Sequence, residues 1–277
     1  MKIKYLLLVI PISLMVSLLS GCSSTFSFLK PAPTPIPELP GWVLVWQDEF
    51  DGKKINEENW TYDIGGWGWG NGEAQYYTSR EENARIEEGV LVIEAQQEKY
   101  ENSYYTSARL KTQGLQEFQY GRIEARIKVP EGQGFWPAFW MLGAGFDGEN
   151  WPDCGEIDIM EFVGREPDLI IGTLHGPGYS GALGLSQWNR QEFNIPDDFH
   201  TYAIEWEEDE IRWYFDGSQY FTVQREDVGN RDWVGNQPYF IILNLALGGT
   251  LGGMIGIETE FPAQLLVDYV RVYQQSD

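Results

Sequence analysis

Short segments of alternating or continuous apolar residues recur along the chain from residue 42 onward. Residues 121–129 alternate between polar and apolar side chains, as expected of an antiparallel strand with one buried face. Four further runs, rich in β-branched and aromatic residues, also predict strands: residues 43–46, 90–93, 211–215 and 239–243. Residues 267–273 predict a closing strand, and helical periodicity is scarce.

Turn signals connect these predicted strands. Asp216 and Gly217 separate two strand-like runs and predict a tight hairpin. Residues 56–60 allow one short helical turn. Many strands without intervening helices predict an all-β fold, namely a β-sandwich.

The first 40 residues have a different pattern. Lys2 and Lys4 precede an apolar run that is short for a membrane span and ends at Cys22. Residues 19–22 resemble a bacterial lipobox, in which Cys22 is lipidated; an ordinary secretory peptide and an uncleaved anchor are the alternatives. Residues 23–40 are rich in proline and predict an extended linker. We therefore expect a signal segment at 1–22, a linker at 23–40 and one large β domain at 41–277, in an exported lipoprotein held at the membrane or cell surface.

Composition narrows the choice of partner. The formal net charge of −23 disfavours nucleic acid and other polyanions, so a neutral polymer fits better. Aromatic residues make up 15% of the chain and supply flat apolar rings. With Cys22 lipidated, Cys154 has no cysteine partner within the mature chain, and we expect a packed, unreactive thiol rather than a nucleophile.

The run GEIDIMEF at residues 155–162 holds three carboxylates and no basic residue. On a strand, Glu156 and Asp158 share a face, whereas Glu161, five positions after Glu156, points the other way. One extra residue in a β-bulge near Ile159 and Met160 would return Glu161 to their face. The alternative is an edge strand with solvated acids, which the apolar neighbours disfavour.

Three clustered acids suit hydrolysis of a glycosidic bond with retention of configuration. That reaction needs a carboxylate nucleophile and a protonated carboxylic acid about 5–5.5 Å apart. Asp158, between the other two, is placed to hydrogen-bond Glu156 and to raise the pKa of a neighbouring acid.

The motif Glu156-Ile-Asp158-Ile-Met-Glu161 resembles the signature of glycoside hydrolase family 16, in the form with an inserted Met that laminarinase-like members carry. The resemblance extends over about residues 42–274. It implies a concanavalin A-like jelly roll with an open concave substrate cleft. It also implies Glu156 as nucleophile, Asp158 as its helper and Glu161 as general acid/base.

Five residues match substrate-contacting positions of that family: Asn71, Arg109, Trp136, Trp140 and His175. The spacing of Trp136 and Trp140 places both on one strand face. The alternative is that these side chains fill the sandwich core, and for Trp140 the sequence does not favour either position. Arg109 is otherwise one charge on a strand. The glycine-rich residues 67–73 predict a mobile rim that presents indoles, Asn244 is a further candidate for the cleft, and His200 is expected to be structural.

The resemblance also implies one structural calcium ion, bound through Glu49, Gly89 and Asp268. Calcium takes oxygen ligands, including backbone carbonyls, so a glycine in the set is chemically sensible. The alternative is that Glu49 and Asp268 are ordinary surface acids. No catalytic cofactor is expected.

The expected function is retaining endo-hydrolysis of β-1,3-glucan by a monomer, with mixed-linkage β-1,3-1,4-glucan as a further substrate. Two alternatives remain. One is a related hydrolase or transglycosylase acting on agar, carrageenan or xyloglucan. The other is a non-catalytic carbohydrate-binding module, which would need the tryptophans but not the three acids together.

Overall fold

The computed structural model describes residues 36–276. The predicted signal segment, the lipidation site Cys22 and most of the predicted linker lie outside these residues. Within residues 36–276, no helix is both long and apolar enough to cross a bilayer.

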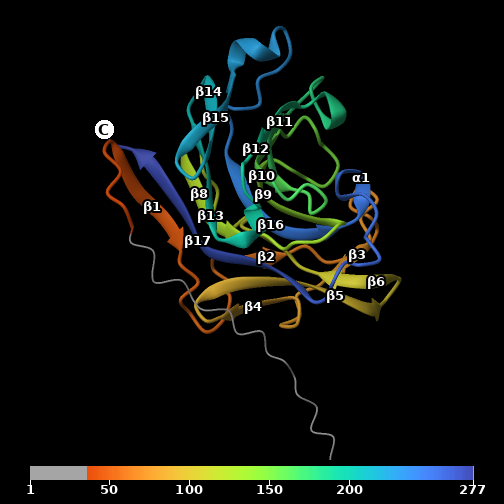
Figure 1. Ribbon diagram of the computed structural model, residues 1–277. Helices are drawn as coiled ribbons and strands as arrows, with labels where there is room; N and C mark the ends of the chain where they lie inside the picture. The colour runs from red at the N-terminus through yellow and green to blue at the C-terminus, as the bar shows by residue number, and fades with distance from the viewer. Residues whose placement is uncertain (1–35, 277) are drawn as a thin grey trace, which may run out of the picture.

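Two large antiparallel sheets form the body of the molecule (Figure 1). The ten-stranded sheet has the order β15 (Ser218–Gln224), β14 (Glu210–Phe215), β13 (His200–Trp206), β8 (Gly121–Lys128), β17 (Ala263–Gln275), β5 (Val90–Tyr100), β6 (Ser103–Ser107) and β3 (Gln75–Tyr77), with β1 (Trp42–Asp48) on β17 and β4 (Ala84–Glu87) on β5. The pair β3–β6 is parallel.

The seven-stranded sheet has the order β12 (Leu185–Arg190), β11 (Leu169–His175), β10 (Glu156–Phe162), β9 (Phe135–Gly143), β16 (Tyr239–Leu247), β7 (Arg109–Lys111) and β2 (Thr61–Tyr62). Between residues 36 and 276, helical structure is limited to α1 (Gly249–Gly252) and the 3-10 turns η1 (Gly181–Leu183), η2 (Ile195–Asp197) and η3 (Arg225–Val228). The predicted all-β sandwich is confirmed.

The core lies between the two sheets and is built from alternate side chains of each strand. In β8, Ile123, Ala125 and Ile127 point inward and are fully buried. Strand β16, near the middle of its sheet, is buried along its whole length. The hairpin predicted at Asp216 and Gly217 joins β14 to β15, and both residues have positive φ, as a type I′ turn requires.

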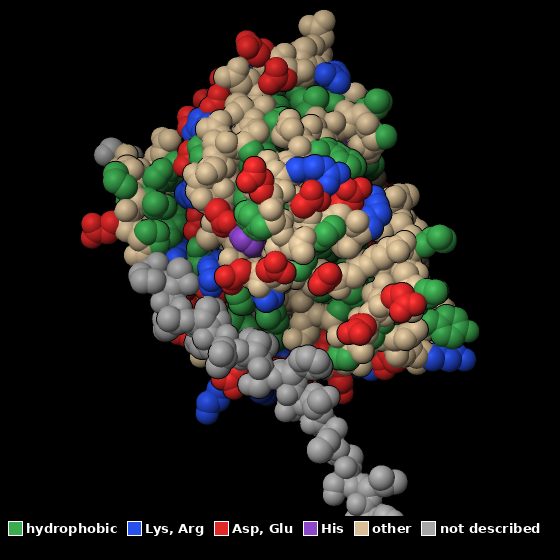
Figure 2. Space-filling view, in the orientation of Figure 1, with side chains coloured by type: hydrophobic (Ala, Val, Ile, Leu, Met, Phe, Trp, Pro, Cys, Tyr) green, Lys and Arg blue, Asp and Glu red, His purple; other side chains and the backbone are tan. Residues whose placement is uncertain are grey.

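The polar face of β8 differs from the half-exposed face that its alternation predicts. Arg122 and Glu124 are only 8% and 7% exposed, because they pair with each other and Arg122 also pairs with Glu205. Elsewhere on the surface, acidic side chains are spread over the face shown in Figure 2 rather than gathered in one patch.

Candidate active site

Strand β10 lies inside the seven-stranded sheet, between β9 and β11, so the edge-strand alternative is wrong. Against β9 the register shifts between Asp158 and Met160, and against β11 between Asp158 and Glu161. This is the predicted β-bulge. Ile159 and Met160 are both buried in the core, and Glu161 returns to the face that carries Glu156 and Asp158.

The bulge is supported from the opposite sheet. The buried indole of Trp213, on β14, donates a hydrogen bond of 2.8 Å to the backbone carbonyl oxygen of Asp158. A bulge disrupts the local ladder of hydrogen bonds, and an unpaired buried carbonyl is costly. Trp213 therefore stabilises the backbone at the point where the acidic residues change register.

A cleft of about 690 Å³ lies on the face of the seven-stranded sheet that points away from the core. Trp136, Ala138, Trp140 and Leu142 of β9 form part of its floor, as the period of two requires. The acids of β10 lie along one side. Loops supply the walls, which include Trp67, Trp69, Asn71, Glu73, Phe146 and Trp151.

Two indoles hold the two outer acids. Trp151 Nε1 donates to Glu156 Oε2 at 2.9 Å, and Trp136 Nε1 donates to Glu161 Oε1 at 3.0 Å. His175, paired with Glu156 across β10 and β11, places its Nε2 atom 3.2 Å from Asp158 Oδ2 and 3.7 Å from Glu156 Oε1. Each carboxylate therefore has a fixed neighbour, and His175 lies beside the nucleophile candidate.

Burial raises the pKa of all three acids, and the charge of Asp158 raises the pKa of the other two further. Burial, followed by the charge of Asp158, raises the pKa of Glu156 and that of Glu161 to about 8 in each case. Burial raises the pKa of Asp158 to about 8, against a hydrogen bond with Glu156 that lowers it. Because burial disfavours the charged form of each acid, and neighbouring charges repel, the group retains protons at neutral pH. A protonated Glu161 can then act as an acid, while Glu156, hydrogen-bonded to Asp158, is the nucleophile candidate.

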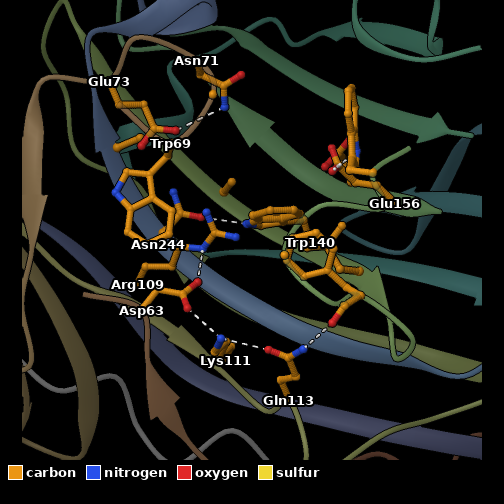
Figure 3. Close-up of a pocket in the computed structure, with 18 of the residues that line it drawn as sticks. Asp63, Trp69, Asn71, Glu73, Arg109, Lys111, Gln113, Trp140, Glu156 and Asn244 are labelled. Carbon is orange, nitrogen blue, oxygen red and sulfur yellow. Dashed lines mark hydrogen bonds and ion pairs between the residues drawn. The ribbon is translucent and has the colours of Figure 1, made fainter. Parts of the chain in front are cut away.

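The remaining predicted contacts line the cleft on the other side of β9 (Figure 3). The Arg109 guanidinium lies between the rings of Trp69 and Trp140, 5.1 and 4.6 Å from their centroids. Trp140 Nε1 donates to Asn244 Oδ1 at 2.7 Å, and Asn71 donates to Glu73 at 3.2 Å. Trp140 is therefore a cleft residue rather than a core residue.

Sequence reasoning missed several cleft residues. Trp151 lies in the loop before β10, and its cleft position depends on the path of that loop. Asp63 pairs with both Arg109 and Lys111, at 3.0 and 2.6 Å, which leaves the cleft end with one net positive charge among the three groups. The WGWG spacing did indicate an aromatic rim, and Trp67 and Trp69 lie with ring centroids 4.0 Å apart.

Comparison with known proteins agrees with this geometry. The family description "Glycosyl hydrolases family 16" matches residues 71–269. The chain belongs to glycosyl hydrolase family 16. It is a glycoside hydrolase.

Individual relatives cover nearly the whole chain. This chain is 47% identical over 273 residues to a β-glucanase from Rhodothermus marinus, and the match covers 94% of this chain and 93% of that protein. The endo-β-1,3-glucanase from Pyrococcus furiosus has a TM-score of 0.82 and 47% identity, covering 85% of this chain and 95% of its own. The laminarinase from Rhodothermus marinus has a TM-score of 0.79 and 48% identity, covering 85% and 98%.

Two residues outside the cleft of this family 16 hydrolase have structural roles. His200 pairs with Asp216 at 2.7 Å and stacks against both Phe193 and Phe215, as expected of a structural histidine. Cys154 is buried, and burial raises the pKa of its thiol to about 11, which suits a packed, unreactive cysteine.

The three predicted calcium ligands lie at one junction of the ten-stranded sheet. Asp48 of β1 pairs with Val270 of β17, and Leu91 of β5 pairs with Val267, so the ends of β1 and β5 meet beside Asp268. Glu49 and Gly89 flank these two ends. Their oxygen donors fit calcium chemically. Glu49 also pairs with Arg271, and Asp268 with Arg126, so two arginines share these carboxylates.

Proposed function

We propose that this family 16 enzyme cuts β-1,3-glucan internally with retention of configuration, and that it also accepts mixed-linkage β-1,3-1,4-glucan. The observation that carries the proposal is the bulge in β10, which places Glu156 and Glu161 on one face, each held by a separate indole. The relatives described above, a β-glucanase, an endo-β-1,3-glucanase and a laminarinase, support the choice of polymer.

The first half-reaction makes a covalent glycosyl-enzyme. Protonated Glu161 donates its proton to the glycosidic oxygen, while the Glu156 carboxylate attacks the anomeric carbon. The bond between that carbon and the oxygen breaks, and the leaving half departs with the proton. Asp158 assists as the hydrogen-bonded neighbour that holds the Glu156 carboxyl group in position.

The second half-reaction releases the bound sugar. Glu161, now ionised, takes a proton from water as the water oxygen attacks the anomeric carbon, and the ester bond to Glu156 breaks. If another sugar hydroxyl replaces water, the same intermediate gives transglycosylation.

Product analysis on laminarin, lichenan, agarose and xyloglucan tests the polymer assignment. We expect a ladder of oligosaccharides from laminarin, a slower one from lichenan, and none from the other two. Glu156→Gln should lose more than about a thousandfold in kcat with an unchanged fold, whereas Glu208→Gln, at an exposed turn, should retain full activity. Binding of laminarin without cleavage by the wild type would favour the binding-module alternative.

We also propose that Cys22 is lipidated and that the chain is held at a membrane surface by this anchor and the following proline-rich residues. The support is the sequence pattern of residues 1–40 alone. Metabolic labelling with palmitate should mark the wild type and not Cys22→Ala. An unlabelled wild type released into the medium would contradict the anchor.

A further inference from the structure

The face that carries the catalytic acids continues onto the edge strand β12. Glu161 pairs with Ile171 of β11, and Ile171 pairs with Trp188 of β12. Residues directly opposite each other in antiparallel strands point to the same face. Trp188 therefore lies on the same face as Glu161, two strands or roughly 10 Å away.

Other contacts of β12 agree with this orientation. Thr173, whose partner on β10 is Asp158, donates from its hydroxyl to the Ser186 hydroxyl at 3.1 Å. Leu185, one position from Ser186, packs instead against the core. Since Trp188 follows Ser186 by two positions, its side chain points away from the core, where it is 50% exposed.

The cleft described above, with its loop walls, does not reach β12. Its lining residues come from β10, from the strands on the β9 side and from loops, and none of them belongs to β11 or β12. A polymer cut at an internal bond must nevertheless extend past β10 in both directions. The half that passes over β11 and β12 meets the outward face of these strands, on which Trp188 is an exposed aromatic side chain.

We propose that Trp188 is a binding platform for the leaving half of the glucan chain, a site that rests on the function proposed above. An indole stacks on the apolar face of a pyranose ring and needs few polar partners. The walled side, with Arg109, Trp140 and Asn71, suits the half that stays bonded to Glu156. The open side suits the half that must depart before water attacks.

Kinetics on two substrates test this assignment. Trp188→Leu keeps apolar cover over buried Ile171 but removes the flat ring. We expect its kcat/KM on long β-1,3-glucan to fall about tenfold, mainly through KM. On an aryl glycoside of laminaribiose, which has no sugar beyond the scissile bond, kcat/KM should stay within about twofold of wild type.

Matched variants separate stacking from folding. Trp188→Phe should recover most of the activity on the polymer. Tyr104→Ala, at a still more exposed aromatic residue on the other sheet, should match wild type on both substrates. Unchanged activity of Trp188→Leu on long glucan, or equal losses on both substrates, would contradict the proposed role of Trp188 as a binding platform. If wild type itself cut no β-glucan, the proposed function would fail instead.

Discussion

The indole of Trp136 donates a hydrogen bond to the carboxylate of Glu161, 25 positions later in the chain, at 3.0 Å. This bond favours the ionised form of Glu161, against burial and the charge of Asp158, which favour the protonated form. The balance sets the pH at which Glu161 acts as an acid, because a general acid must be protonated when substrate binds.

Replacing Trp136 by Phe removes this donor. The pKa of Glu161 should rise, so the basic limb of the kcat/KM profile should move to higher pH while kcat falls about tenfold to a hundredfold. The control is Trp233→Phe, which removes an indole donor to the Glu208 carbonyl outside the cleft. A basic limb that stays in place would show that Trp136 does not tune Glu161.

Replacing Trp213 by Phe tests the support of the bulge. The buried carbonyl of Asp158 loses its donor, which should cost about 1–3 kcal/mol of unfolding free energy. Trp206→Phe removes an equally buried donor to the Gly235 carbonyl, also 2.8 Å long. We expect similar losses of stability by chemical denaturation, but a lower kcat only for Trp213→Phe. Equal kcat values for Trp213→Phe and Trp206→Phe would show that support of the bulge does not affect catalysis.

The raised pKa of Asp158 gives a stability prediction with a definite sign. Its pKa is about 8 in the folded chain against an ordinary value of 3.8, so the folded state binds more protons between these pH values. Stability should therefore fall as pH rises through this window, by at most about 1.4 kcal/mol per pH unit.

Asp158→Asn removes this proton uptake. Its melting temperature relative to wild type should increase between pH 5 and pH 8.5, measured by calorimetry, whereas exposed Asp209→Asn should show a constant difference. A constant difference for Asp158→Asn as well would contradict the raised pKa.

Calcium binding at Glu49, Gly89 and Asp268 is proposed from the resemblance and from their shared junction. Calcium at a hundredfold excess over Kd should add about 2.7 kcal/mol, which raises the melting temperature by about 5–10 °C. A chelator should reverse the shift in the wild type and have no effect on Asp268→Asn. A wild-type melting temperature that changes with neither calcium nor chelator would contradict the proposed calcium site.

The sequence predicted the sandwich and the bulge because both follow from side-chain periodicity. The odd spacing of Glu156 and Glu161 already requires an extra residue if both are to share a face. Periodicity does not indicate which distant side chain donates a hydrogen bond to the free carbonyl at the bulge, so the role of Trp213 was missed. Trp151 was missed because loop paths have no period, and the burial of Arg122 was missed because it depends on ion pairs between strands far apart in the sequence.

Trapping of the covalent intermediate tests the central claim most directly, namely that Glu156 and Glu161 act together in a double displacement. The wild type would be incubated with an activated 2-deoxy-2-fluoro glycoside of laminaribiose, digested and mapped by mass spectrometry. We predict one 2-fluoro-laminaribiosyl group on Glu156, and labelling that persists in Glu161→Gln because the activated leaving group needs no proton. A label on Glu161, or an enzyme that turns over the reagent without any labelled carboxylate, would contradict the account.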